Sequence, residues 1–188
     1  YPDGAGENDI DAIAYSPAGF IWDNVVAHGK TLRNYGEFMI SHKSWTDSAR
    51  KGKPRFVDAW RDYTTGSRDV AVWSEPGIES LRAHSPTNAL GWETGVPDVW
   101  RARHFIEDLR EFEKAGNFPA FTILYPPNDH TSGTSAGQPT PAASVADNDL
   151  AVGQVVEALS RSKFWPETVV FAIEDDPQNG WDHVSGYR

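Results

Sequence analysis

Amphipathic helical patterns alternate with short apolar runs in the second half of the chain, and this alternation limits the fold more than any other feature of the sequence. Between Asp98, which suits a helix N-cap, and Gly116, which suits a helix end, apolar residues recur three and four positions apart. The apolar run Phe118–Tyr125 follows and stops at two prolines, as expected of a strand buried on both faces. A helix followed by such a strand is one unit of an α/β fold.

A second helix and a second apolar run repeat this order. Residues 126–143 are rich in Pro, Gly, Ser and Thr and predict a loop. Ser144 and Asp147 have the spacing of a capping box, which places the start of the next helix at Ser144. The β-branched run Thr168–Ile173 predicts another strand. The chain is therefore predicted to be α/β, with a mostly parallel sheet flanked by helices.

The first half of the chain carries weaker signals. Phe20–His28 predicts a short helix, and Thr31–Phe38 predicts a short strand. Turn-forming residues recur throughout 41–98, where Asp69–Trp73 has the character of a strand, so we expect a loop-rich cap or insertion there. With 188 residues, the whole chain from 1 to 188 is predicted to be a single domain.

Composition excludes several classes of function. The net charge is −10, which argues against nucleic-acid binding, because a phosphate backbone needs a basic surface. The chain has no Cys, so disulfides, thiolate catalysis and Cys-based zinc sites are excluded. No apolar run approaches the roughly 20 residues of a membrane-spanning helix, so no transmembrane segment is expected.

Two clusters of acidic and imidazole side chains follow the two best-predicted strands. The first holds Asp129 and His130, and the second holds Asp175 and Asp176, with His183 shortly after. Because ligand sites in parallel sheets lie beyond the carboxyl ends of the strands, both clusters are expected at one edge of the sheet. Mixed carboxylate and imidazole sets suit Zn, Mn or Fe, whereas oxygen-only sets suit Mg or Ca. The alternative is a pair of ordinary turns, since Asp and Asn are common turn formers.

Three segments closely resemble motifs of the bacterial phosphoesterase family, which includes phospholipase C-like and acid phosphatase enzymes. They read PNDHTSGT at 127–134, VADNDLAVG at 145–153 and VFAIEDDPQNGWDHV at 170–184, and Asn34-Tyr-Gly-Glu37 is similar more weakly. The chain is most similar to a branch that is fused to a β-propeller. The resemblance implies an alkaline-phosphatase-like fold, metal-dependent hydrolysis of phosphate esters, a periplasmic or secreted location, and a β-propeller as a companion domain of the full-length protein.

The resemblance also implies roles for particular residues. Asp175 and Asp176 match the family's paired metal-binding carboxylates, and Asp129 and His183 match further metal ligands. His130 matches the histidine near the phosphate, and His183 is a second candidate for proton transfer. The implied cofactor is a divalent metal (Zn, Mn, Fe or Ca), which would neutralise charge on the phosphoryl oxygens of a small phosphate ester or a lipid headgroup.

One part of the family pattern has no match. Family members carry an early strand followed by an acidic-Asn pair and a Ser or Thr nucleophile, and residues 1–40 offer no convincing counterpart. The chain is therefore expected to hold only part of an active site, as an incomplete alkaline-phosphatase-like domain. By itself it is expected to bind metal poorly and to turn over little substrate.

Other interpretations stay open for several residues. The chain could be a non-catalytic binding module whose acidic cluster is a relic or binds Ca, or a hydrolase that uses its carboxylates without metal, as glycosidases do. The acidic residues around Asn148 favour a helix dipole and need no further role, although they could support the site. Four tryptophans could form a specificity cap or a separate apolar cluster, namely Trp45, Trp60, Trp73 and Trp92.

Overall fold

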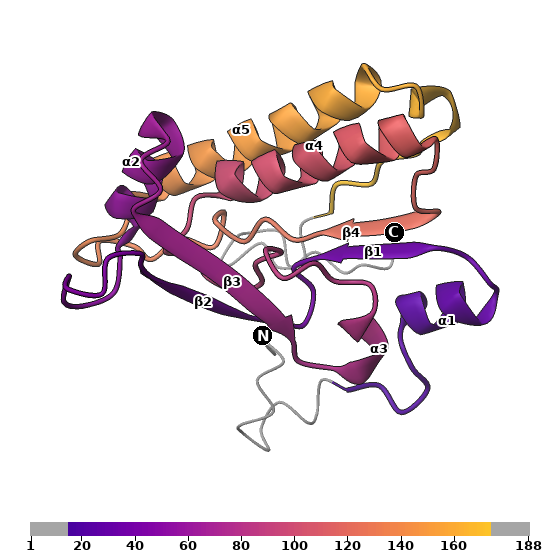
Figure 1. Ribbon diagram of the computed structural model, residues 1–188, viewed down its shortest axis with the longest axis horizontal. Helices are drawn as coiled ribbons and strands as arrows, with labels where there is room; N and C mark the ends of the chain where they lie inside the picture. The colour runs from indigo at the N-terminus through magenta and orange to yellow at the C-terminus, as the bar shows by residue number, and fades with distance from the viewer. Residues whose placement is uncertain (1–14, 174–188) are drawn as a thin grey trace, which may run out of the picture.

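A computed structural model describes residues 15–173 and contains two small sheets and five α-helices over that range (Figure 1). The elements in chain order are α1 (Ile21–Ala27), β1 (Leu32–Tyr35), β2 (Met39–Trp45), α2 (Phe56–Thr65), β3 (Val70–Pro76), α3 (Glu79–Arg82), α4 (Asp98–Ala115), β4 (Phe121–Leu124), α5 (Pro141–Ser160) and the 3-10 turn η2 (Trp165–Glu167). Within this range no helix combines the length and hydropathy needed to span a bilayer.

The central sheet pairs β1 with β4 in parallel. The register runs from Leu32 opposite Phe121 to Tyr35 opposite Leu124. Helices α4 and α5 lie side by side over one face of this sheet (Figure 1), and their apolar residues pack with Tyr35 and Leu124 in one core cluster. A parallel strand pair covered by helices confirms the general α/β class, and the alkaline-phosphatase-like fold stays a prediction.

Residues 41–98 are more regular than the sequence suggested. Strands β2 and β3 form an antiparallel pair in this stretch, with α2 between them in the chain. The predicted strand at Asp69–Trp73 overlaps the first half of β3, but β2, α2 and the short α3 were missed. The reason is visible in β2, where Ser41 and Lys43 lie on the same face as the buried Met39 and the partly buried Trp45. Their inward polar side chains hide the period-two pattern of a half-buried strand.

Helix α5 begins earlier than predicted. Thr140 is its N-cap and accepts a hydrogen bond from the amide of Ala143 at 3.3 Å, and Pro141 occupies the first helical position. The predicted start at Ser144 is therefore wrong by about one turn. The Ser144 hydroxyl instead donates to the backbone oxygen of Asn128 at 2.7 Å, and so fastens the helix to the preceding loop. The predicted helix end at Gly116 is confirmed, because this residue caps α4 with a φ of 76°.

The predicted strand at Thr168–Ile173 is absent from the described structure. This segment has no sheet pairing, and its large apolar residues are exposed, with Phe171 80% and Ile173 83% accessible. High β-propensity alone does not make a strand, because a strand needs a hydrogen-bonding neighbour and a buried face. Over the described range β4 pairs with β1 alone, so it is half-buried and not covered on both faces as predicted.

Candidate functional site

The carboxyl ends of β1 and β4 lie next to each other, and both strands point toward the side of the molecule where α2 lies (Figure 1). The amide of Tyr125 donates to the carbonyl of Tyr35 at 3.0 Å and so extends the pairing past the strand ends. At Gly36, with a φ of 126°, an added Cβ would lie 2.6 Å from the Leu90 carbonyl and 2.9 Å from Tyr125 Cβ. Glycine is therefore required for the turn after β1 to lie this close to its neighbours.

The Asn34–Glu37 segment forms that turn. The Asn34 side chain, which is fully buried, donates to the Glu37 carbonyl at 2.8 Å and accepts from the Glu37 amide at 3.0 Å. This segment was the weaker of the motif resemblances. The strand pairing puts it beside the segment that leads into Asn128, at the same edge of the sheet.

All hydrogen-bonding groups of Asn128 except one have a partner within the protein. Its side-chain amide donates to the Val96 carbonyl at 3.0 Å and to Asp147 Oδ2 at 2.9 Å, and its backbone amide donates to Asp98 Oδ2 at 2.9 Å. The residue is fully buried. Its Oδ1 atom has no hydrogen-bond partner within residues 15–173, which leaves one buried acceptor oxygen open in the motif.

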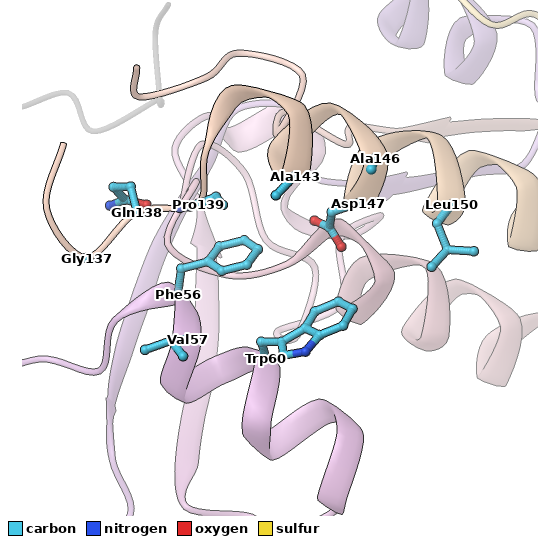
Figure 2. A pocket seen from close by; sticks show the side chains of 10 residues that line it. All are labelled: Phe56, Val57, Trp60, Gly137, Gln138, Pro139, Ala143, Ala146, Asp147 and Leu150. Carbon is cyan, nitrogen blue, oxygen red and sulfur yellow. The ribbon is translucent and has the colours of Figure 1, made fainter. Parts of the chain in front are cut away.

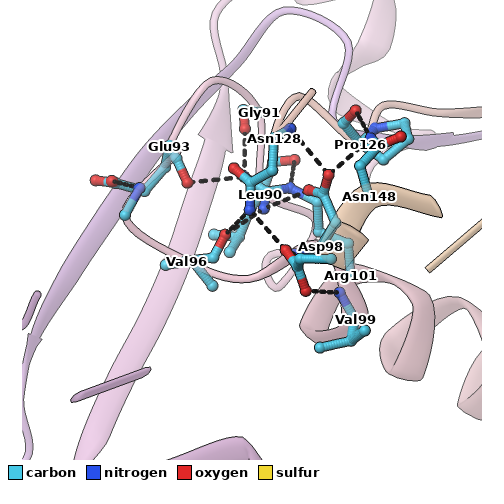
Figure 3. Close-up of polar contacts among 12 residues, drawn as sticks. Leu90, Gly91, Glu93, Val96, Asp98, Val99, Arg101, Pro126, Asn128 and Asn148 are labelled. Atoms are coloured by element: carbon cyan, nitrogen blue, oxygen red, sulfur yellow. Dashed lines mark hydrogen bonds and ion pairs between the residues drawn. The ribbon is translucent and has the colours of Figure 1, made fainter. Parts of the chain in front are cut away.

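A buried ion pair lies behind Asn128 (Figure 3). Arg101 Nη1 donates to Asp98 Oδ1 at 3.0 Å, and their side chains are 2% and 0% exposed. Burial raises the pKa of Asp98 to about 6 against the attraction of Arg101, and burial lowers the pKa of Arg101 against the attraction of Asp98. Removing either partner would leave an uncompensated buried charge, so the pair must act as a unit.

Asp147 caps a helix other than its own. Its Oδ2 accepts from the amide of Asp98 at 2.6 Å, at the N-terminus of α4, while the residue itself belongs to α5. The interpretation of Asp147 as a favourable charge in the first turn of its own helix is therefore wrong. The next residue, Asn148, donates to Asp98 Oδ2 at 2.9 Å and to the Pro126 carbonyl at 2.7 Å. The VADNDLAVG motif thus supports Asn128-Asp129-His130, called the NDH segment below, through direct hydrogen bonds.

Asp129 and His130 project from this buried frame into solvent. Both are exposed, and Asp129 Oδ1 accepts from the His130 amide at 3.0 Å. The His130 ring packs against Trp92 with ring centres 4.6 Å apart and an interplanar angle of 74°. Asp175, Asp176 and His183 lie outside the described residues, so their approach to His130 stays a prediction. Within residues 15–173 no three His, Asp or Glu side chains converge as a metal site.

No family model, curated protein or solved structure matches this chain.

The four tryptophans are dispersed and do not form one cap. Trp45 packs with the cluster around Val70, and Trp73 is 45% exposed and stacks on His42 with ring centres 5.3 Å apart. Within residues 15–173, Trp92 is the one tryptophan whose ring contacts a predicted site residue, His130. Trp60 lines a separate groove.

That groove, of about 560 Å³, lies between α2 and the first half of α5 (Figure 2). Aromatic and aliphatic side chains of α2 form one wall, small residues and a leucine of α5 form the other, and Asp147 lies between them; the lining residues are Phe56, Val57, Trp60, Gly137, Gln138, Pro139, Ala143, Ala146, Asp147 and Leu150. The volume is in the range of small-molecule pockets. Because Asp147 is hydrogen-bonded to Asn128, the groove adjoins the frame of the NDH segment.

Proposed function

We propose that the protein contributes to metal-dependent hydrolysis of phosphate esters. One observation carries the proposal: an Asp-His pair at the carboxyl end of a parallel strand is exposed to solvent while the residue before it is locked into a buried polar network. A rigid support beneath exposed acid and imidazole groups is what a catalytic site needs, because the reacting groups must be held in place. The motif resemblance to phosphoesterases supports the same function.

The donor atoms of the NDH segment fit part of a metal site. Asp129 offers a carboxylate, His130 offers an imidazole, and the buried Oδ1 of Asn128 is an amide oxygen without a partner in the described structure. Oxygen and imidazole donors together suit Zn, Mn or Fe, and Ca if oxygens alone bind. Asp175, Asp176 and His183 are proposed to complete the set, with Asp129 as the ligand from the NDH segment.

The proposed roles divide binding from proton transfer. A bound metal supplies neutralisation of negative charge on the phosphoryl oxygens. His130 is proposed to donate a proton to the leaving oxygen, because its imidazole is exposed to solvent and histidine is the most common general acid in enzymes. His183 is proposed as a metal ligand or a second proton-transfer group. We assign an apolar portion of the ester to the groove beside Asp147, which favours substrates larger than a bare phosphate monoester.

The test is a hydrolysis assay on the complete gene product, with p-nitrophenyl phosphate and bis-p-nitrophenyl phosphate, paired with elemental analysis. We expect activity that a chelator removes and that Zn or Mn restores. His130→Gln should lower kcat at least roughly 100-fold, the size of a general-acid contribution. His28→Gln is the matched control, since His28 is exposed at the end of α1 and should leave the rate unchanged.

Three results would oppose the proposal. Unchanged turnover in His130→Gln would remove the proton-transfer role. Metal binding without hydrolysis of either ester would favour the binding module with a Ca-binding cluster. Chelator-resistant cleavage of glycosides would favour a carboxylate-only hydrolase.

A further inference from the structure

The contact between Trp92 and His130 joins two segments that lie far apart in the chain. Neither residue belongs to a helix or strand. Residues in such segments are usually mobile unless other groups hold them, so the 4.6 Å ring contact needs a cause. The cause lies in the buried polar groups behind both segments.

Arg101 holds the segment that carries Trp92 (Figure 3). Its guanidinium donates to the carbonyl oxygens of Gly91 at 2.8 Å, Glu93 at 3.1 Å and Val96 at 2.9 Å, with a longer contact to Leu90 at 3.4 Å. These carbonyls lie on both sides of Trp92. A planar fork with five donors can satisfy such a set, whereas the compact ammonium of a lysine cannot.

A second restraint acts directly beside Trp92. The Gly91 amide donates to the Ser41 hydroxyl of β2 at 2.8 Å. A Cβ added at Gly91 would overlap the Met39 carbonyl and lie 2.8 Å from the Gly36 carbonyl. The backbone before Trp92 is therefore pressed onto the turn that follows β1, and the indole has little freedom to move away from the carboxyl end of that strand.

Asp98 holds the segment that carries His130. Its Oδ2 accepts from the Asn128 amide at 2.9 Å and from Asn148 Nδ2 at 2.9 Å, and Asn148 reaches on to the Pro126 carbonyl. Its Oδ1 accepts from Arg101. One ion pair thus fixes both sides of the ring contact.

We infer that Asp98 and Arg101 are positioning residues, which fix Trp92 against His130 and so set the orientation of the imidazole. The expected effect on turnover rests on the proposed function. The effect on the orientation of His130 does not. Trp92 is the last link, because an edge-to-face ring pair at this distance favours a limited range of ring orientations. A merely structural ion pair would stabilise the fold without this effect on the imidazole.

The test compares Trp92→Leu with Trp73→Leu in the complete gene product. Trp73 is a partly exposed tryptophan that stacks on a histidine of the β2–β3 pair. Its replacement therefore makes the same chemical change at a Trp–His contact outside the proposed site. The first readout is the NMR signal of the His130 imidazole, namely its chemical shifts and its nuclear Overhauser contacts. We expect Trp92→Leu to shift that signal and change its contacts, and Trp73→Leu to leave both unchanged. An unaltered His130 signal in Trp92→Leu overturns the inference.

Arg101→Lys extends the test to the ion pair. The variant keeps the charge but loses the fork, so we expect the His130 signal to shift in the same direction as in Trp92→Leu. If Arg101→Lys folds and leaves the His130 signal unchanged, the role of Arg101 is refuted. If Arg101→Lys does not fold, Trp92→Leu still tests the contact between the two rings. The second readout is turnover, for which a misplaced imidazole should lower kcat roughly 10- to 100-fold with KM within about twofold. Shifted His130 signals in a protein without hydrolase activity would refute the proposed function and leave the positioning inference intact.

Discussion

Asp98 is the residue whose ionisation bears most directly on the buried frame. Burial raises its pKa from 3.8 to about 6. The folded protein therefore holds this proton more tightly than the unfolded chain, so the contribution to stability is complete below about pH 4 and is lost as the pH rises through about 6. Asp98→Asn cannot titrate at this position. We predict that the free energy of unfolding of the native chain falls relative to that of Asp98→Asn between pH 4 and pH 7.

Urea unfolding at a series of pH values measures this difference. Parallel pH profiles for the two proteins would mean that the Asp98 carboxyl has an ordinary pKa and that its pairing with Arg101 outweighs its burial.

We expect the replacement of Arg101 to lower the free energy of unfolding more than most single substitutions. Arg101→Met removes the donor to several carbonyl groups and leaves Asp98 as an uncompensated buried charge. Breaking such a pair costs about 3–5 kcal/mol, and we predict a loss of that size in the free energy of unfolding. Arg110→Met is the control, because Arg110 is exposed on the same helix and its loss should cost less than about 0.5 kcal/mol. Equal, small losses would show that the guanidinium is not buried in solution.

At the residue scale the sequence located the NDH segment but not its support. Asp129 and His130 could be singled out because they follow an apolar run that ends in prolines. Arg101 could not, because an arginine within an amphipathic helix is expected to face solvent, and no sequence pattern shows that the preceding loop at 90–96 folds back and offers it four carbonyl acceptors. Trp92 was one of four tryptophans proposed for a specificity cap, and only the three-dimensional structure shows that its ring contacts His130.

At the scale of the elements, the predicted strand at 168–173 differs most from the structure, in which this segment pairs with no other strand. Phe171 is 80% exposed, whereas Phe105 of α4 is 2% exposed in the core. We predict that Phe105→Ala lowers the free energy of unfolding by about 3–5 kcal/mol and that Phe171→Ala changes it by less than about 0.5 kcal/mol. The two variants remove the same atoms, so chemical denaturation compares burial alone. A large loss of unfolding free energy in Phe171→Ala would instead support the buried strand that the sequence predicted.

Most elements of the second half could be predicted, and the reason is physical. Helix α4 has a clear apolar face and a glycine cap, and β4 is a short apolar run before two prolines. The start of α5 was misplaced because Thr140-Pro141 and Ser144 with Asp147 are both valid starting signals, and tertiary hydrogen bonds occupy the second pair. In β2 the inward serine and lysine serve contacts to the loop at 91–93, which local patterns cannot reveal.

At the scale of the whole molecule, the groove between α2 and α5 extends the proposed site. We predict that Trp60→Ala raises KM roughly tenfold for a phosphodiester that carries a long alkyl group, equivalent to about 1.4 kcal/mol of lost apolar contact. Its KM for p-nitrophenyl phosphate should stay within about twofold. Trp73→Ala is the control, since Trp73 lies on β3, outside the groove. An equal rise in KM for both esters would show that the groove does not bind the alkyl group.

The proposed phosphoesterase site requires that the NDH segment and the acidic residues at 174–184 bind one metal together. Paramagnetic broadening by Mn²⁺ of histidine signals tests this directly in the complete gene product. We predict that substoichiometric Mn²⁺ broadens the His130 and His183 signals, leaves the His28 signal sharp, and loses this selectivity in Asp175→Asn. If His130 is broadened no more than His28, the metal does not lie beside the NDH segment and the proposed phosphoesterase site is contradicted.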